Sequence, residues 1–272
     1  DIFPDMEAIK NQFHLLVRTV PSNGTIINPQ RSEHIDSVLE RGCWSERQTF
    51  SAADEISQPS KSPADLSAQT SKPDGSAFSV RLNSKIVGTV NWTLNGDHNI
   101  ANALAAILAA RNVGVTPAIA CEALGKFTGV KRRMEVIYKK DGLTVYDDFA
   151  HHPTAVKTTL AGLRQSVGDE GIMVILEPGS HTMRKGTHKD KLAPAVADAD
   201  RVIWFQPENM QWDMNMTLSS EHSSIHSNVP DIINFTIDTI KESSIQHLVI
   251  MSNSGFQGIH NLLIDRLKIT KD

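Results

Sequence analysis

The sequence predicts an α/β protein, and three observations support that prediction. At 272 residues the chain can form one large domain or two of ordinary size, and two is the expectation we prefer. Apolar strands alternate with helical segments after Gly129, which is typical of a doubly wound, mostly parallel sheet. A strand pair followed by two helices precedes Gly129. We therefore place a domain boundary at residues 129–130.

The first predicted domain begins with a helix from Met6 to Val17 that Pro21 ends. The segment "GTIINP" (24–29) is predicted to be a short buried strand, and "HIDSVLERG" (34–42) is predicted to be a short helix. Residues 51–76, rich in Ser, Ala, Asp, Lys and Pro, are predicted to be an exposed loop that is poorly ordered in part. Residues 76–94 alternate around an N-S-K turn as a strand pair does. Residues 100–110 are apolar almost all round, which predicts a helix buried on most sides, and a second helix runs from Pro117 to about 127.

The second predicted domain opens with "RRMEVIYKKDGLTVYDDF" (132–149), two strands joined by a tight K-D-G turn. Three apolar strands follow, "GIMVILEP" (171–178), "RVIWFQP" (201–207) and "QHLVIMSNS" (246–254). Residues 154–165, 189–197 and 259–268 can carry helices between and after them. This order favours a parallel sheet with helices on its faces.

Composition excludes several classes of function. A net charge of -4 with scattered Lys and Arg provides no basic face for nucleic acid, and no apolar run reaches the roughly 20 residues that span a bilayer. Cys43 and Cys121 lie far apart without a C-x-x-C pair, which fits a reducing cytoplasm. We therefore expect a cytoplasmic protein that binds neither nucleic acid nor membrane. The sequence leaves its oligomeric state open.

Polar residues follow three of the predicted strands. They are Asp147, Asp148, His151 and His152 in "DDFAHHP", the segment "EPGSHTMRKG" (177–186), and the segment "SNSGFQG" (252–258). Ligands of open α/β sheets bind beyond the carboxyl ends of the strands, so three polar strand ends indicate a binding face, although any one alone could be a cap or a solvated turn. Adjacent histidines without H-E-x-x-H or C-x-x-C make zinc improbable. A carboxylate at a strand end suits ribose hydroxyls, and we expect His152 to cap the helix at Pro153.

Two further segments carry candidate binding residues. In "GDHNIAN" (96–102), Asn99 and Asn102 share one face at a helix start, where an amide can both donate to and accept from adenine, although either Asn alone is more commonly a cap. In "FTGVKRRMEV" (127–136), Lys131, Arg132 and Arg133 are either a solvated charge run or phosphate-binding cations at a hinge.

The order of these motifs resembles the Mur ligases, the ATP-dependent amide-forming enzymes of peptidoglycan synthesis. "GDHNIANALAA" resembles their adenine segment, "FTGVKRRME" their linker arginine segment, and "DDFAHHPTAV" the opening of their C-terminal domain. The resemblance implies that residues 1–129 form the rear of a P-loop-type ATPase central domain and residues 130–272 a Rossmann-like, mostly parallel C-terminal domain. "SHTMRKGTH" and "MSNSGFQGIH" are similar to the branch that joins UDP-N-acetylmuramate to a murein tripeptide, L-Ala-γ-D-Glu-meso-diaminopimelate, in cell-wall recycling.

The resemblance also implies a role for each matching residue. Asn99, Asn102 and His98 would lie at adenine, Asp148 at the ribose, and Arg132 and Arg133 at the phosphates. Arg133 and His151 would act beside the nucleotide during catalysis. Residues facing the incoming peptide would be Ser180, His181, Arg184, Lys185 and Ser254. The cofactors implied are ATP and Mg²⁺, with no metal ligand expected among these residues.

Departures from the family pattern limit these expectations. The G-K-[ST] phosphate loop is missing, and the family's magnesium-binding His would fall before Asp1. We therefore expect a fragment that cannot catalyse alone. Ser254 and Gln257 stand where relatives would have glycines. Other hypotheses stay open: an L-alanine-adding or folylpolyglutamate-type ligase of the same family, or a non-catalytic nucleotide- or peptide-binding module.

Overall fold

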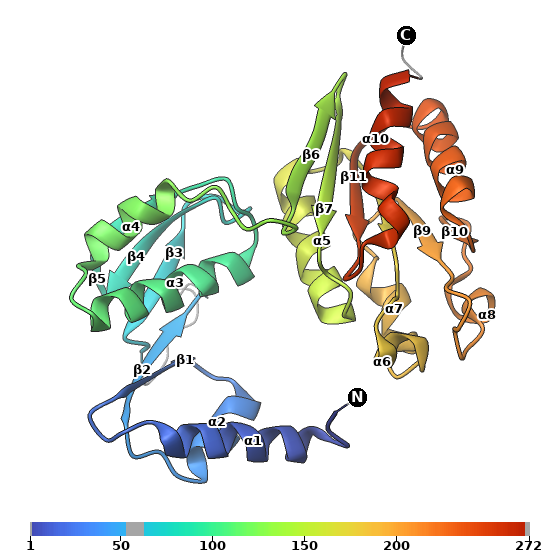
Figure 1. The fold of residues 1–272 in the computed structure, drawn as a ribbon. Coiled ribbons are helices and arrows are strands. Elements are labelled where there is room, and N and C mark those ends of the chain that lie inside the picture. The colour runs from blue at the N-terminus through green and yellow to red at the C-terminus, as the bar shows by residue number, and fades with distance from the viewer. Residues whose placement is uncertain (1, 53–62, 270–272) are drawn as a thin grey trace. The chain divides into compact units, whose positions relative to one another are not determined.

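The computed structural model describes residues 2–52 and 63–269. The chain divides into two units, Asp1–Thr128 and Gly129–Asp272, coloured blue to green and green to red in Figure 1. Within the described residues the first unit holds a five-stranded sheet and the second a six-stranded one. The predicted α/β class, with a mostly parallel sheet in the second unit, is confirmed.

The first unit contains a mixed sheet in the order β1-β2-β3-β4-β5. Strands β1, β2 and β3 run parallel, and β3, β4 and β5 form an antiparallel meander. Its described elements are α1 (Met6–Thr19), β1 (Thr25–Pro29), α2 (Glu33–Glu40), β2 (Glu46–Ser51), β3 (Leu66–Thr70), β4 (Ala77–Leu82), β5 (Lys85–Asn91), α3 (Asp97–Asn112) and α4 (Pro117–Gly125).

The core of this unit forms where α3 packs on the sheet. Ile100, Leu104 and Ile107 of α3 are fully buried against strand residues that include Phe78, each worth roughly 1.5–3 kcal/mol of burial. Helix α4 lies on β5, where a Cβ on Gly88 would come within 2.7 Å of the Cys121 sulfur, so this strand needs glycine for the close approach.

Several expectations for the first unit are wrong. Helix α3 is not one of them: within residues 100–110 only Asn102, Ala106 and Ala109 are exposed, along one stripe, and the rest are buried or half-buried, as predicted. Strand β1 is half-buried, with Asn28 as its one buried residue. The predicted 51–76 loop contains β3, and β2 was not predicted. Residues 53–62 of that loop lie outside the described residues. Helix α1 begins where predicted, because the Asp5 carboxylate accepts a hydrogen bond from an amide of its first turn.

The second unit contains a doubly wound sheet in the order β10-β9-β8-β11-β7-β6. All neighbouring pairs are parallel except β6 with β7, which form the predicted hairpin. Its described elements are β6 (Glu135–Lys140), β7 (Leu143–Asp148), α5 (Pro153–Val167), β8 (Gly171–Leu176), α6 (His181–Arg184), α7 (Lys189–Ala195), β9 (Arg201–Phe205), α8 (Met214–Leu218), β10 (Ser223–His226), α9 (Val229–Glu242), β11 (Ile245–Met251), the 3-10 helix η1 (Phe256–Gly258) and α10 (Ile259–Ile269).

Both faces of this sheet are covered, as a parallel sheet requires. Residues of α9 and α10 pack on one face, and residues of α5, α7 and α8 pack on the other. The sequence did not predict α6, α8, β10 or α9. None of the helices in the described ranges is long and apolar enough to cross a membrane.

Candidate functional site

The carboxyl ends of three parallel strands of the second unit bring distant polar residues together. In the register of the sheet, Met251 of β11 lies opposite both Asp148 of β7 and Leu176 of β8. The Ser252 amide donates to the Asp148 carbonyl at 3.1 Å, and the Glu177 amide donates to the Met251 carbonyl at 3.0 Å. The three polar segments that follow these strands therefore start from one edge of the sheet, as the sequence predicts.

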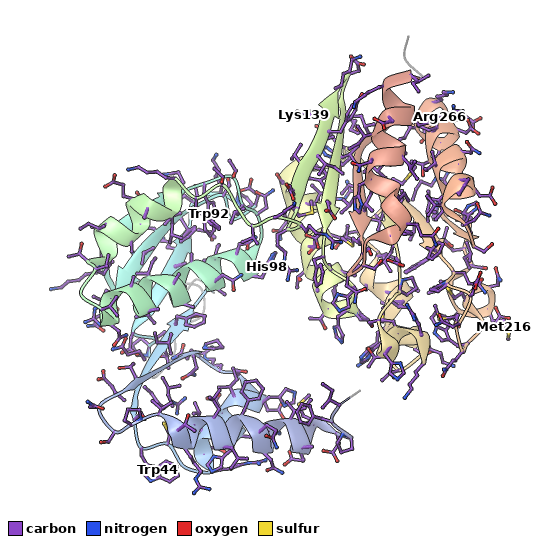
Figure 2. The ribbon with its side chains drawn as sticks, in the orientation of Figure 1. Trp44, Trp92, His98, Lys139, Met216 and Arg266 are labelled. Carbon is purple, nitrogen blue, oxygen red and sulfur yellow. The ribbon has the colours of Figure 1, made fainter. Side chains whose placement is uncertain are left out.

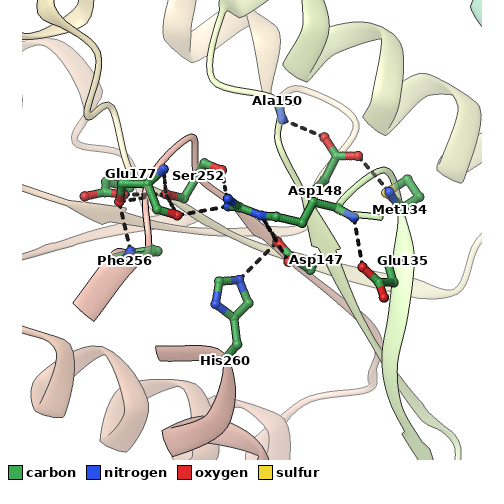
Figure 3. A network of polar contacts seen from close by, with 11 residues as sticks. Met134, Glu135, Asp147, Asp148, Ala150, Glu177, Ser252, Phe256 and His260 are labelled. Carbon is green, nitrogen blue, oxygen red and sulfur yellow. Dashed lines mark hydrogen bonds and ion pairs between the residues drawn. The ribbon is translucent and has the colours of Figure 1, made fainter. Parts of the chain in front are cut away.

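Asp148, the predicted ribose ligand, is 2% exposed and hydrogen-bonded to the backbone. Its two carboxylate oxygens accept from the Ala150 amide at 2.7 Å and the Met134 amide at 2.8 Å (Figure 3). Burial raises the pKa of this carboxyl above its ordinary value, against the opposing effect of the two amide donors and the nearby Arg133. In this geometry Asp148 holds residues 134 and 150 together at the strand end, and its role at a ribose stays a prediction.

Arg132 is directed into the second unit rather than outward. Its Nη2 donates to the carbonyls of Ser252 at 2.6 Å and Ser254 at 3.0 Å, and its Nε lies 3.2 Å from Asp147. Asp147 also contacts the Nε2 atom of His260 at 3.1 Å (Figure 3). Arg132 has a positive φ of 57°, and its own carbonyl accepts from the Phe149 amide at 2.9 Å. These contacts engage the Nε and Nη2 atoms of the Arg132 guanidinium within the second unit.

Arg133 is the arginine of this segment that faces solvent. It is exposed, and its guanidinium carbon lies 5.7 Å from the centre of the Phe149 ring. Neighbouring His151 is half-buried, and its Nδ1 lies 3.0 Å from the Phe149 carbonyl. Because a carbonyl only accepts, Nδ1 is the donor in this contact, and Nε2 is not used by it. Arg133 and His151 are thus the members of this cluster whose polar atoms are open to a ligand.

His152 caps helix α5, as the sequence predicts. Its Nδ1 accepts from the Thr154 amide at 3.3 Å, and its ring stacks edge-on with His188 at 4.6 Å between centroids. Burial, followed by the positive potential of His188, His151 and Lys191, lowers the pKa of His152. This pair is a structural contact between α5 and the segment before α7.

The segment after β8 carries four of the predicted peptide-facing residues on and around α6. The Ser180 hydroxyl caps this helix, and His181 and Lys185 are exposed. Arg184 is half-buried, and its Nε is buried with no hydrogen-bond partner among the described residues. Trp212, which the sequence did not single out, fixes this segment: its Nε1 donates to the Met183 carbonyl at 2.8 Å.

In the first unit, the start of α3 carries the predicted adenine-binding residues. Gly96 precedes the helix with a φ of 88°, a conformation that favours glycine. The Asn99 Nδ2 donates to the Asn95 carbonyl at 2.8 Å, so part of this amide is used locally. Asn102 and His98 are exposed on the first turns, and Figure 2 labels His98 there. Asn99 and Asn102 therefore share the predicted face, with Asn102 the more accessible.

Sequence reasoning placed Glu177 and Ser252 in polar strand-end segments but gave no role to either of these buried residues, and it did not single out half-buried His260. A usable signal existed for Glu177, because a carboxylate directly follows five buried apolar residues of β8. Within the described residues, no three His, Cys, Asp or Glu side chains are grouped to hold a metal ion.

Two parts of the chain match domain models of one protein family. Residues 1–110 match the Mur ligase middle domain, and residues 132–253 match the Mur ligase glutamate ligase domain. The chain belongs to the Mur ligase family.

Individual members of the family are similar to this chain along nearly its whole length. The chain is 41% identical over 270 residues to the UDP-N-acetylmuramate–L-alanyl-γ-D-glutamyl-meso-2,6-diaminoheptandioate ligase of Escherichia coli, covering 98% of this chain and 56% of that protein. It is 38% identical to the corresponding Haemophilus influenzae ligase, with 99% and 57% covered. The crystal structure of a murein peptide ligase from Psychrobacter arcticus superposes with a TM-score of 0.69 at 38% identity, with 97% and 55% covered. The chain thus spans a little over half the length of these relatives.

Proposed function

We propose that this chain is part of an ATP-dependent ligase that joins UDP-N-acetylmuramate to the tripeptide L-Ala-γ-D-Glu-meso-diaminopimelate in cytoplasmic cell-wall recycling. The observation that carries the proposal is the 41% identity, along 98% of the chain, to a protein named for those substrates. We assign residues 1–129 to the rear of the central ATP-binding domain and residues 130–272 to the C-terminal domain.

The chemistry requires activation of a carboxylate, because amide formation in water is uphill and a carboxylate is a poor electrophile. A carboxylate oxygen of UDP-N-acetylmuramate attacks the γ-phosphorus of ATP, and the P–O bond to ADP breaks. The amine of the tripeptide then attacks the acyl-phosphate carbon, loses a proton, and expels phosphate that retains one carboxylate oxygen. Positioning and electrostatics supply most of the rate enhancement in phosphoryl transfer.

We assign the contacts with the nucleotide mainly to side chains that are accessible to solvent. Asn102, with Asn99 and His98 beside it, would contact adenine from the start of α3. Exposed Arg133 would balance phosphate charge, for which a guanidinium fork is well suited. The Nε2 of His151 would accept a hydrogen bond or a proton beside the nucleotide. Asp148 would support the ribose region through the loop that it holds, since both of its oxygens already accept from backbone amides.

The peptide roles rest on the segments after β8 and β11. The exposed residues His181, Lys185 and Ser254 would face the incoming tripeptide, with Ser180 shaping the turn. Arg184 retains a buried Nε–H without a partner among the described residues, a donor of the kind that a carboxylate satisfies. Magnesium serves the family together with ATP, but the described residues offer no grouped ligands for it, and no step here depends on one.

Phosphate release tests the proposal. The full-length native polypeptide that carries this chain would receive ATP, Mg²⁺ and UDP-N-acetylmuramate, with either L-alanine or the tripeptide as amine. Release that depends on the tripeptide supports the recycling ligase. Release with L-alanine alone would identify the alanine-adding enzyme, and release with neither amine would favour a binding module without ligase activity.

A further inference from the structure

The loop after β11, residues 252–258, is held by its own serine hydroxyls. Both the Ser252 and Ser254 hydroxyls donate to the Oε2 atom of Glu177, the second of them at 2.5 Å. Each hydroxyl has one proton, so donation to the carboxylate leaves its lone pairs for the backbone. Those lone pairs accept from the Ser254 amide at 2.9 Å and from the Phe256 amide at 2.8 Å. The Glu177 carboxylate therefore orients two side chains that in turn fix two backbone amides.

Arg132 holds the same loop by donating hydrogen bonds to the backbone carbonyls of the loop. The guanidinium spans the carbonyls of Ser252 and Ser254, while Asp147 pairs with its Nε (Figure 3). Donors and acceptors of the loop are thus both satisfied by charged side chains that arrive from distant parts of the unit. Charge-assisted hydrogen bonds are stronger than neutral ones, and their geometry is more restrictive.

The loop also contains a strained turn that needs such support. Phe256 and Gln257 have φ values of 42° and 48°, a left-handed conformation that is costly for residues other than glycine. Phe256 is buried and packs on Phe205 at 5.2 Å between ring centroids, while Gln257 is exposed. A strained turn persists only where its surroundings over-determine it. The inner side of the loop, which includes the Ser254 hydroxyl, is therefore anchored, while Ser254 and Gln257 remain exposed as whole residues.

We propose that Glu177 is a positioning residue that, with Arg132, holds the loop 252–258 in the shape that receives the incoming peptide. This inference rests on the proposed function, in which Ser254 faces the peptide. Glu177 is 8% exposed and acts through Ser252 and Ser254, so it is not assigned a contact with the amine.

Two variants of Glu177 in the full-length native polypeptide test the inference. Glu177→Ala removes the acceptor for both hydroxyls, whereas Glu177→Gln keeps one carbonyl oxygen as an uncharged acceptor. We expect Glu177→Ala to raise KM for the tripeptide and to speed amide hydrogen exchange at 252–258, each by roughly tenfold, with KM for ATP changed by less than about twofold. In Glu177→Gln, the rise in KM for the tripeptide and the increase in exchange rate should both be smaller than in Glu177→Ala. The pH profile of kcat should stay unchanged.

The matched control is Glu170→Gln at the opposite end of β8. Glu170 accepts from or pairs with the His247 Nε2 at 2.7 Å, so the same chemical change is made away from the loop. This variant should leave exchange at 252–258 and KM for the tripeptide at their original values.

The outcomes separate this inference from the proposed function. If the unmodified polypeptide forms no amide with the tripeptide, the proposed function fails, and the peptide-receiving role falls with it. If it is active but Glu177→Ala leaves both loop exchange and KM for the tripeptide unchanged, the positioning role alone is wrong. Loss of kcat in Glu177→Gln with a shifted pH profile and unchanged loop exchange would instead show that Glu177 takes part in the reaction directly.

Discussion

Adjacent Arg132 and Arg133 should differ sharply in their effect on stability. Truncating Arg132 to Ala removes two hydrogen bonds from a charged donor to backbone carbonyls, and it leaves the largely buried Asp147 with His260 but without its arginine partner. Bonds of this kind contribute about 1.5–3 kcal/mol each, but the Arg132 side chain is 27% exposed, so water replaces part of the loss. We expect Arg132→Ala to lower the free energy of unfolding by about 2–4 kcal/mol. Arg133→Ala, which loses an exposed cation–π contact, should cost less than about 1 kcal/mol.

Urea unfolding of the purified chain measures this difference. Trp204 lies in the second unit, and replacing Trp44 and Trp92 with Phe leaves fluorescence to report that unit. Arg132→Lys provides an intermediate case, because it keeps the charge and loses the planar fork. Equal losses for the two alanine variants, or an Arg132→Ala loss under about 0.5 kcal/mol, would refute the assignment of Arg132 to the loop.

Three further predictions concern pH, packing and nucleotide binding. Burial lowers the pKa values of His152 and His188 in the folded state. The stability that their neutral rings contribute is therefore fully present above the unfolded pKa of about 6.5, and it is lost as the pH falls through the lower native pKa values. His188→Gln should flatten the fall in unfolding free energy between pH 7.5 and 5.5, and an unchanged slope would contradict this. Gly171→Ala places a Cβ 2.2 Å from a backbone oxygen and should cost about 1–3 kcal/mol or more in urea unfolding, whereas Gly255→Ala, with open space around it, should be near neutral. Asn102→Ala should weaken binding of ATP to the full-length polypeptide roughly fivefold to tenfold by calorimetry, with unfolding unchanged, and equal affinity would remove Asn102 from the adenine site.

Much of the second unit could be predicted because its strands are continuous apolar runs with turn residues at their ends. Strands β8, β9 and β11 are buried on both faces, so composition alone marks them. Strand β3 escaped prediction because "LSAQT" owes its state to pairing with β4 rather than to its own propensity. Helix α9 carried an Asn228 cap and Pro230 in its first turn, a start signal that sequence reasoning overlooked.

Some features of the candidate site could also be predicted from the sequence, and others could not. The strand ends located its edge, and the capping role of His152 followed from the proline after it. The direction of the Arg132 side chain was not predictable, because its carbonyl partners lie about 120 residues away along the chain. The commitment of both Asp148 oxygens to backbone amides likewise depends on how two loops meet. Local sequence places a residue at an edge, but only the tertiary structure determines which polar atoms remain open to a ligand.

Oxygen-isotope transfer tests the central claim most directly. UDP-N-acetylmuramate labelled with ¹⁸O in its carboxylate would be supplied with ATP, Mg²⁺ and the tripeptide to the full-length native polypeptide, and mass spectrometry would follow the released phosphate and the amide product. Activation by phosphoryl transfer predicts one carboxylate-derived oxygen in the phosphate for each amide formed. Amide product accompanied only by unlabelled phosphate would contradict the acyl-phosphate route, and the absence of amide product would contradict the ligase itself.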